Sequence, residues 1–355
     1  MRVAIDISPT KTGHGVRGIG TYTQNLVNEF KKGKWQDVNF EFFQSPASPP
    51  TVDVIHYPYF DFFFHTLPIF KKANRVVATI HDVIPLIFPN HFPQGIKAKF
   101  NFSLQKLALK NIDGVICVSK TTKNDVVNKL SVPKDKVHVV YSAQGQKFKK
   151  LYDKNQLFNV SNKFKLPQNF FLFVGDVNWN KNIIGLLEAV ALAEINLVMV
   201  GKALVDVALA QVRQIDKKIK DLGIDSKITK TGYVSDEDLC AIYNLATATV
   251  MPSFYEGFGF PVLESMACQT PVIASKEASI SEVAGDAAIY FNARDPKDIA
   301  SKISHLLNFD KKSEEKLKEV SLKQAAKFRW SKTAQETIDV YKLIHKINGS
   351  VKRDQ

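Results

Sequence analysis

The sequence predicts an α/β protein of two doubly wound domains, each a parallel sheet covered by helices on both faces. The chain has 355 residues, which suits two domains of ordinary size better than one. Short runs rich in Val, Ile and Phe alternate with helical patterns, as expected of parallel sheets buried on both sides. A polar, lysine-rich stretch at residues 142–169 interrupts this alternation and is the expected linker.

The expected elements form two similar sets. Strands are predicted at residues 2–7, 39–43, 53–57, 75–80, 114–118 and 136–141, and again at residues 170–175, 196–201, 227–232, 248–253 and 270–275. Helices are predicted at residues 19–30, 185–194, 236–246 and 261–268, and the pattern is helical throughout after about residue 296. We therefore place a first domain at residues 1–165, a second at residues 166–330 and a C-terminal helix at residues 331–355, with a cleft between the two domains.

Composition favours a protein that is not embedded in a membrane. Apolar residues make up 45% of the chain, but no stretch reaches the ~18 apolar residues needed to span a bilayer. Residues 1–8 read as a buried strand and lack the cleavage site of a signal peptide. Cys117, Cys240 and Cys268 lie in separate apolar runs without a CxxC pair, so we expect buried free thiols and a cytoplasmic location.

The net charge of +13 lies entirely in the first half of the chain. Residues 1–167 hold 24 Lys+Arg and 11 Asp+Glu, whereas residues 168–355 hold 24 of each, and the first half also has 16 of the 25 Phe. A basic, Phe-rich half predicts an anionic partner, either the inner face of a membrane or a lipid-linked acceptor. The alternative is solvated lysines over a Phe-rich core. Nucleic acid is not expected, because no helix-turn-helix, zinc or RNA-binding motif is present.

Ligands of parallel sheets bind beyond the carboxyl ends of the strands, so the loops there should carry the chemistry. The first such loop contains Gly13, Gly15 and Gly18, which match the GxGxxG pattern of dinucleotide-binding proteins, with Asp37 about 20 residues further on. The turn is not tight, however, and Asp37 precedes the second strand, whereas a ribose-binding acid normally ends it. NAD(P) binding is one alternative. The others are a diphosphate held by helix amides and a glycine loop without a ligand.

A second loop follows the expected strand at residues 170–175. Gly175 ends that strand, and Lys181 stands at the start of the next helix. A lysine there adds to the positive potential of a helix amino end and can meet a phosphate. The alternative is a solvated lysine at a helix start.

The third loop, "SFYEGFGFPVLESMA", places two acids around a glycine turn. Glu256 lies ahead of the expected helix, and Glu264 lies one turn inside it, after Pro261 at a first helical position. Carboxylates accept paired hydrogen bonds from the vicinal hydroxyls of sugars and ribose. The spacing therefore predicts a site with a hydroxyl-binding acid at each end, and the alternative is a solvent-facing pair of acids.

Several motifs together resemble the retaining glycosyltransferases of family 4 (group 1), which have the GT-B fold. The resemblance is carried in the first half by "GVRGIGTYTQNL", "ATIHDVIPLIFP" and "VICVSKTTKNDV". In the second half it is carried by "TGYVSDEDLCAIYNLATATVMPS", "PSFYEGFGFPVLESMACQTPV", "SISEVAGDAAIYFNARD" and "KFRWSKTAQETIDVYK". It implies two Rossmann-like domains facing across a cleft, with a closing helix that crosses back onto the first domain.

The resemblance also implies an activity and its residues. A hexose would move, with retention, from a nucleotide-diphosphate sugar such as GDP-mannose or UDP-glucose to a glycan or lipid-linked acceptor, in cell-envelope polysaccharide or glycolipid synthesis. The implied catalytic residues are Glu256, Lys181 and His81. The implied donor-binding residues are Gly18, Gly20, Gly257, Phe258, Gly259 and Glu264.

The implied roles divide the donor into three parts. Glu256 and the three loop amides after it would hold the sugar, and Glu264 would hold the ribose hydroxyls. Lys181 would meet the diphosphate, helped by amides of the first-domain glycines. His81 would face the transferring sugar, with a structural hydrogen bond at a strand end as the alternative.

The chain departs from the family pattern around the diphosphate. Family members commonly have arginine where Asp176 or Asn180 stands here, so Arg17 or Lys202 is expected to supply further positive charge. Gln269 also replaces a glycine that is common in the family's "ACGTPV" turn.

No metal or other cofactor is expected. The only Asp-x-Asp match, residues 236–238, follows Ser235 in a helix-capping arrangement. A non-catalytic alternative is a sugar-nucleotide-binding partner subunit with impaired catalysis, because the family's arginines are missing.

Overall fold

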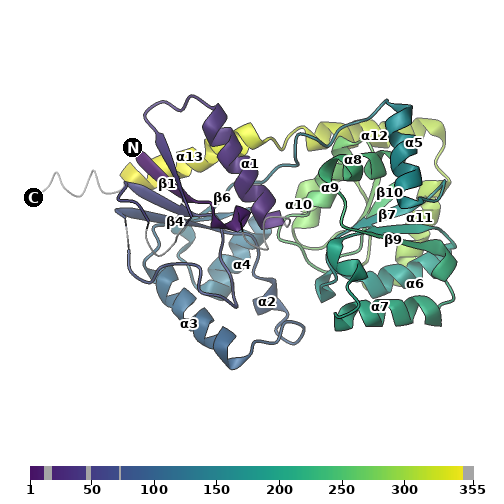
Figure 1. Ribbon diagram of the computed structural model, residues 1–355, viewed down its shortest axis with the longest axis horizontal. Helices are drawn as coiled ribbons and strands as arrows, with labels where there is room; N and C mark the ends of the chain where they lie inside the picture. Colours follow the sequence, from purple (N-terminus) through teal and green to yellow (C-terminus); the bar gives the residue numbers. More distant parts are fainter. Residues whose placement is uncertain (12–17, 45–48, 72, 347–355) are drawn as a thin grey trace, which may run out of the picture. The chain divides into compact units, whose positions relative to one another are not determined.

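The computed structural model describes residues 1–11, 18–44, 49–71 and 73–346, which form two compact units. The first unit combines Met1–Ala143 with Phe328–Gln355, and the second is Gln144–Lys327 (Figure 1). The chain thus changes unit near residue 143, ahead of the expected boundary at residue 165. The stretch expected as a linker contains helix α5 (Lys154–Phe164), whose first amides are capped by the Asp153 carboxylate.

The first unit is a parallel six-stranded sheet in the order β2-β1-β3-β4-β5-β6. Its strands are β1 (Arg2–Asp6), β2 (Asn39–Phe43), β3 (Val54–Tyr57), β4 (Arg75–Ile80), β5 (Gly114–Cys117) and β6 (Val137–Val139). Its helices are α1 (Gly18–Lys32), α2 (Ile84–Ile87), α3 (Ile96–Lys110), α4 (Lys120–Leu130) and α13 (Trp330–Lys346), with short 3₁₀ turns η1 (Ser8–Thr10) and η2 (Lys134–Lys136). Every residue of β3 and of β5 is buried, as expected of strands in a parallel sheet that is covered on both faces.

The second unit is also a parallel six-stranded sheet, in the order β12-β11-β10-β7-β8-β9. Its strands are β7 (Phe171–Val174), β8 (Leu197–Val200), β9 (Ile228–Gly232), β10 (Ala248–Met251), β11 (Val272–Ser275) and β12 (Ile289–Phe291). Its longer helices are α5, α6 (Ile183–Ala193), α7 (Ala210–Asp221), α8 (Asp236–Leu245), α9 (Phe260–Ala267), α10 (Ser279–Ala284), α11 (Pro296–Leu307) and α12 (Lys311–Ala325). The 3₁₀ turns are η3 (Trp179–Lys181), η4 (Lys202–Val205), η5 (Asp225–Lys227) and η6 (Gly285–Ala287).

Helices cover both faces of this sheet, as the sequence predicts. Figure 1 shows α8 and α9 on one side of β7 and β10, and α6 and α7 on the other. The face toward α6, α7 and α11 is filled by a single apolar cluster that includes Leu186, Leu197 and Ile303. Strand β12 was not expected, because it has only three residues and two of them are partly exposed.

The closing helix α13 is joined to the sheet of the first unit by buried polar contacts. The Tyr341 hydroxyl lies 2.6 Å from Nδ1 of His56 on β3, and His56 Nε2 lies 2.8 Å from the Thr79 hydroxyl on β4. Arg75 adds a hydrogen bond from Nε to the carbonyl of Ile344 (3.0 Å). Burial lowers the pKa of His56 to about 3, so the ring is neutral and both of its nitrogens need these hydroxyl partners.

Replacing Tyr341 with Phe should therefore destabilise the first unit. The variant keeps the ring but leaves Nδ1 of buried His56 without its partner, which we expect to lower the free energy of unfolding by about 1–3 kcal/mol. Urea unfolding monitored by circular dichroism measures the change, and Tyr152→Phe, at an exposed tyrosine, is the control. Equal stability of the Tyr341→Phe variant and the wild type would show that the contact does not hold α13.

Candidate functional site

The loops that carry most of the predicted residues meet at one edge of the second unit. Strands β10, β7 and β8 are neighbours in its sheet, so the segments that follow them emerge side by side at the carboxyl edge. The loops after β7 and β8 approach so closely that a Cβ on Gly201 would lie 2.0 Å from the carbonyl oxygen of Gly175. Only glycine fits at that position.

An ion pair joins the loop after β7 to the loop after β10. Nζ of Lys181, the last residue of η3, lies 2.7 Å from Oε1 of Glu256, and the two side chains are only 15% and 10% exposed. A close and largely buried pair is costly to break, because either charge alone would remain in a poorly solvated place. The structure thus brings together Lys181 and Glu256, two of the predicted site residues.

Backbone-directed hydrogen bonds hold this pair in position. Nδ2 of Asn180 donates to the carbonyl of Tyr255 (2.9 Å), and the Asn180 carbonyl accepts from the amide of Phe254 (2.7 Å). Nδ2 of Asn182 donates to the carbonyl of Pro252 (3.1 Å). Asn180, at one of the positions where the family commonly has arginine, therefore braces the loop that carries Glu256.

The glycine turn after Glu256 leads directly into helix α9. Gly259 precedes the helix with φ +100°, a left-handed conformation that strongly favours glycine. Ser279 braces the turn from α10, because its hydroxyl donates to the carbonyl of Glu256 (2.8 Å) and lies 3.1 Å from that of Phe258. Helix α9, whose amino end carries a partial positive charge, thus begins at Phe260, four residues after Glu256.

The second acid, Glu264, lies one turn inside α9 and contacts α8. The Tyr243 hydroxyl donates to its Oε2 at 2.8 Å. Burial raises the pKa of Glu264 to about 7, although the bond from Tyr243 acts in the opposite direction. One carboxylate oxygen is thus fixed by Tyr243, and the group changes its charge near neutral pH.

Other predicted positions near this edge have local partners. Asp176 accepts a hydrogen bond from the amide of Val177 (2.7 Å). Lys202 begins η4 and is exposed, in the loop beside that of Gly175. The residues that were weighed as a GxGxxG pattern, and Arg17 with them, lie at 12–18, of which only Gly18 is among the described residues.

The Asp-x-Asp match belongs to the capping of α8. The Ser235 hydroxyl accepts from the amide of Asp238 at 3.1 Å, as the sequence predicts. Lys147 and Lys163 pair with the acids of this first helical turn. Among the residues that the structure describes, no group of three or more His, Cys, Asp or Glu is arranged to hold a metal ion.

The predicted residues of the first unit lie at its own sheet and helix ends. His81 directly follows β4, and its Nε2 donates to the carbonyl of Pro58 at 3.0 Å, while its ring packs edge-on against Tyr22. Burial lowers the pKa of His81 to about 4, so the imidazole is neutral at neutral pH. Gly18 and Gly20 form the first turn of α1, with Gly18 exposed and Gly20 buried.

Three residues that position the site were not predicted: Tyr243, Ser279 and Asn182. Tyr243 is fully buried on α8 and looks like a core residue in the sequence. Ser279 follows a non-glycine residue with positive φ, Ala278, which sequence patterns do not reveal. Asn182 itself has a left-handed backbone at the start of α6, and only its position one residue after Lys181 could have drawn attention to it.

Replacing Glu264 with Gln should remove a pH-dependent penalty on stability. The pKa of Glu264 is raised from an ordinary value of 4.5 to about 7, so its contribution to stability is full below about pH 4.5 and is lost as the pH rises through 7. We expect the free energy of unfolding of Glu264→Gln relative to wild type to increase by roughly 2–3 kcal/mol between pH 4.5 and pH 8.

Chemical denaturation of both proteins across this pH range measures the difference, and the exposed Glu315→Gln serves as the control. A difference between Glu264→Gln and wild type that does not change with pH would contradict the raised pKa.

Both units of the chain match models of known protein families. The model described as "Glycosyl transferases group 1" matches residues 154–324, and that described as "Glycosyltransferase Family 4" matches residues 48–143. Between them the two matches include most of the chain. The loops around Lys181 and Glu256 lie inside the first match, and His81 lies inside the second.

Several related proteins are bacterial and are named mannosyltransferases. The serotype-specific mannosyltransferase WbdA of Escherichia coli is 30% identical over 279 residues, which make up 77% of this chain and 34% of that protein. The O-antigen chain mannosyltransferase B of Escherichia coli is 29% identical over 296 residues, 81% of this chain and 75% of that protein. The chain therefore spans about a third of the length of WbdA.

Solved structures agree over nearly the whole chain. A glycosyltransferase from Rickettsia africae superimposes with a TM-score of 0.70 at 18% identity and covers 97% of this chain and 98% of its own. Sucrose-phosphate synthase from Thermosynechococcus elongatus gives a TM-score of 0.72 at 18% identity, with 97% and 99% covered. At these identities the likeness shows the fold, which is GT-B as the sequence predicts.

Proposed function

The chain belongs to the family 4, or group 1, glycosyltransferases, and we propose that it is a retaining, metal-independent hexosyltransferase. Its donor is a nucleotide-diphosphate sugar, and its acceptor is a glycan or a lipid-linked glycan in cell-envelope polysaccharide or glycolipid synthesis. The related proteins are named mannosyltransferases, two of them of the O-antigen chain, so we propose mannose as the sugar and GDP-mannose as the donor, ahead of UDP-glucose.

The observation that carries this proposal is the buried Lys181–Glu256 pair at the amino end of α9. A cation, a carboxylate and a helix amino end within one short region suit the two halves of a sugar diphosphate. Lys181 and the first amides of α9 take the negative diphosphate, and Glu256 accepts hydrogen bonds from sugar hydroxyls. Glu264, with one oxygen fixed by Tyr243, offers its other oxygen to the ribose.

The proposed chemistry needs stabilisation of a leaving group more than it needs a nucleophile. As the anomeric C–O bond breaks, negative charge develops on the departing diphosphate and positive charge on the sugar ring. Lys181 and the amino end of α9 stabilise the negative charge on the diphosphate, and the Glu256 carboxylate lies near the positive charge on the sugar ring. The acceptor hydroxyl attacks the face that the diphosphate leaves, and a phosphate oxygen takes its proton, so no metal is required.

Glu256→Ala should abolish transfer while leaving the protein folded. The change removes the proposed sugar contact, and we expect kcat to fall by at least about 100-fold, as when a group acting in the transition state is lost. Release of the nucleoside diphosphate from GDP-mannose, in the presence of acceptor glycan, measures turnover. Glu315→Ala, at an exposed acid on α12, is the matched control and should retain full activity.

Thermal unfolding of the same samples separates loss of chemistry from loss of structure, because Glu256→Ala also leaves Lys181 without its partner. Full turnover in a folded Glu256→Ala variant would contradict the proposed role of Glu256 in sugar transfer. Transfer by the purified chain alone excludes the alternative of a subunit with impaired catalysis.

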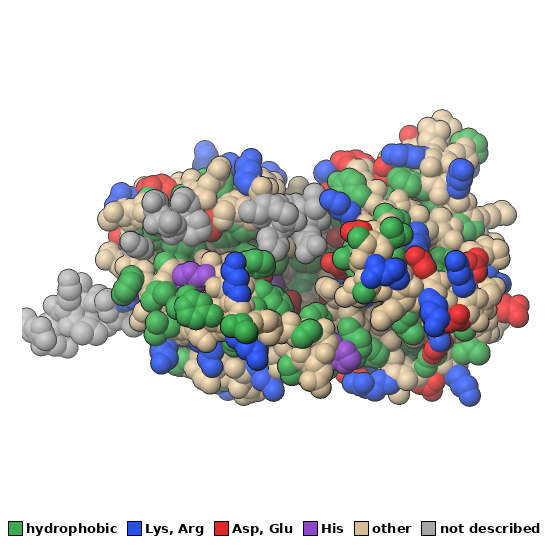
Figure 2. Space-filling model, turned by 60° about the horizontal axis from the view of Figure 1, so that its bottom comes forward, with side chains coloured by type: hydrophobic (Ala, Val, Ile, Leu, Met, Phe, Trp, Pro, Cys, Tyr) green, Lys and Arg blue, Asp and Glu red, His purple; other side chains and the backbone are tan. Residues whose placement is uncertain are grey.

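A second part of the proposal concerns an apolar and basic surface on the first unit. Helix α3 presents Ile96, Phe100 and Leu107, which are 90%, 63% and 45% exposed. These positions are four and seven residues apart, so they lie on one side of the helix. Figure 2 shows green apolar side chains interspersed with blue basic ones on the face of the first unit that this view brings forward.

Charge and neighbouring loops extend this surface, which we call the α3 surface (Phe64, Phe70, Ile96, Phe100 and Leu107). The helix carries Lys97, Lys99, Lys106 and Lys110 and no acidic residue. The loop with Phe64 is tied to the helix by a hydrogen bond from Asn101 to the carbonyl of Phe63, and the loop with Phe70 by one from Asn111 to that of Ile69.

An exposed apolar stripe on a helix that carries several lysines and no acidic residue is typical of helices that lie in the surface of an anionic membrane. No helix among the described residues is long and apolar enough to cross a bilayer. We therefore propose that the α3 surface contacts the inner face of the cell membrane, which would bring the enzyme to lipid-linked acceptors.

Reversing two lysine charges should weaken membrane binding. Lys97→Glu/Lys99→Glu is expected to lower the partition coefficient on phosphatidylglycerol-containing vesicles at least about tenfold at low salt, because each basic residue near such a surface contributes about 1 kcal/mol. Co-sedimentation measures this, and binding of the wild type should fall as salt rises. Lys217→Glu/Lys220→Glu on α7, with the same charge change, should bind like wild type. Failure of the wild type to bind at low salt would refute the proposal.

A further inference from the structure

A cavity of about 290 Å³ opens at the edge of the second unit opposite the loops that carry Lys181 and Glu256. Thr247 lies just before β10, and Thr270 and Pro271 lie just before β11, so the cavity is at the amino ends of these strands. The proposed donor site uses the carboxyl ends. The two places are therefore separated by the length of the strands, and this cavity is not part of the site described above.

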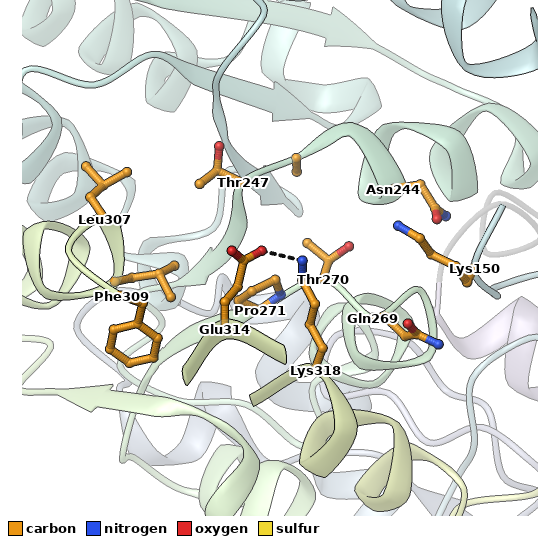
Figure 3. Close-up of a pocket in the computed structure, with 12 residues that line it drawn as sticks. Lys150, Asn244, Thr247, Gln269, Thr270, Pro271, Leu307, Phe309, Glu314 and Lys318 are labelled. Carbon is orange, nitrogen blue, oxygen red and sulfur yellow. Dashed lines mark hydrogen bonds and ion pairs between the residues drawn. The ribbon is translucent and has the colours of Figure 1, made fainter. Parts of the chain in front are cut away.

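The lining has two chemically different ends (Figure 3). Leu307 and Phe309 form an apolar end, and Leu306 also lines the cavity. Lys150 and Gln269 lie at the other end, and Lys318 lies between, paired with Glu314. Most of the surface that lines the opening is polar, so the cavity suits a polar or charged small molecule rather than an apolar one.

The polar end carries positive charge that the protein only partly compensates. Lys318 is paired with Glu314, but Lys150 has no hydrogen bond or ion pair to any residue that the structure describes. Partial burial lowers the pKa of Lys150, and the nearby charge of Lys318 lowers it further. An anion beside the Lys150 ammonium group would favour its charged form.

A second, independent observation concerns Gln269, which lines the same end of the cavity. Its amide donates to the carbonyl of Met266 (3.0 Å), and the amide of Thr270 donates to that of Ser265 (2.9 Å), which together form a Schellman motif at the end of α9. The residue in this position has φ +59°, where glycine is the usual choice and where resemblance to the family also leads one to expect glycine. This chain instead places a side-chain amide there, in the wall of the cavity.

We propose that this cavity binds a small phosphate monoester of about the size of a hexose phosphate. The phosphate oxygens would be met by the Lys150 and Lys318 ammonium groups and the Gln269 amide, and the body of the ligand would lie against Leu307 and Phe309. A phosphate dianion compensates the positive charge of Lys150, which has no acidic partner in the described part of the chain. It contacts Lys318 alongside the Glu314 carboxylate. The proposal does not depend on the donor or the transfer reaction assigned above.

The test uses glucose 6-phosphate as the charged probe and glucose as the uncharged one, titrated calorimetrically into the full chain. Lys150→Ala should weaken binding of glucose 6-phosphate at least about tenfold, the equivalent of one lost charge-assisted contact. Gln269→Gly should weaken binding while raising the melting temperature, because glycine relieves the left-handed backbone. Lys316→Ala, at an exposed lysine on the same helix as Lys318, should bind like wild type.

Lys181→Ala separates this cavity from the proposed donor site. Retained binding in Lys181→Ala together with loss in Lys150→Ala supports the proposal, whether or not transfer activity is found. Loss of binding in Lys181→Ala but not in Lys150→Ala would assign the phosphate to the other edge of the sheet and overturn the proposal. No heat of binding for glucose 6-phosphate at millimolar concentration, or equal binding of glucose, would also overturn it.

Discussion

The ion pair between Lys181 and Glu256 is the contact around which the candidate functional site of the second unit is arranged. It joins the loops that follow β7 and β10, and each of its members is largely buried. Because a charge left alone in such a place is costly, the two loops are held in one arrangement. Asn180 adds backbone-directed hydrogen bonds across the same junction, and Ser279 fixes the glycine turn that follows. The proposed sugar and diphosphate positions are thus built before any ligand arrives.

The fold was predictable because most of its strands are short, largely buried and rich in apolar residues. Eleven of the twelve strands lie within the expected stretches, and both sheets are parallel, as the strand–helix alternation predicts. The missed strand β12 has three residues and too little burial to leave a pattern. Helix α5 was missed because ten of its eleven residues remain at least partly exposed, so its lysine-rich sequence resembles a linker.

The candidate site was predictable only in its polar residues. Glu256, Glu264 and Lys181 stand in loops or at helix ends, where charge is conspicuous in a sequence, and the structure places Lys181 directly against Glu256. The contact between Tyr243 and Glu264 could not be foreseen, because it joins two helices through a residue that is otherwise core. The role of Asn180 also needed the structure. The sequence shows only that asparagine stands where the family commonly has arginine, whereas the structure shows that Asn180 joins two loops by hydrogen bonds.

A crystal structure of the protein with GDP, and in parallel with UDP, tests the central claim most directly. The account predicts a diphosphate oxygen within hydrogen-bond distance of Lys181 Nζ, beside the amino end of α9, and ribose hydroxyls on the Glu264 oxygen that Tyr243 does not occupy. A nucleotide bound elsewhere, or one whose ribose does not reach Glu264, would contradict it.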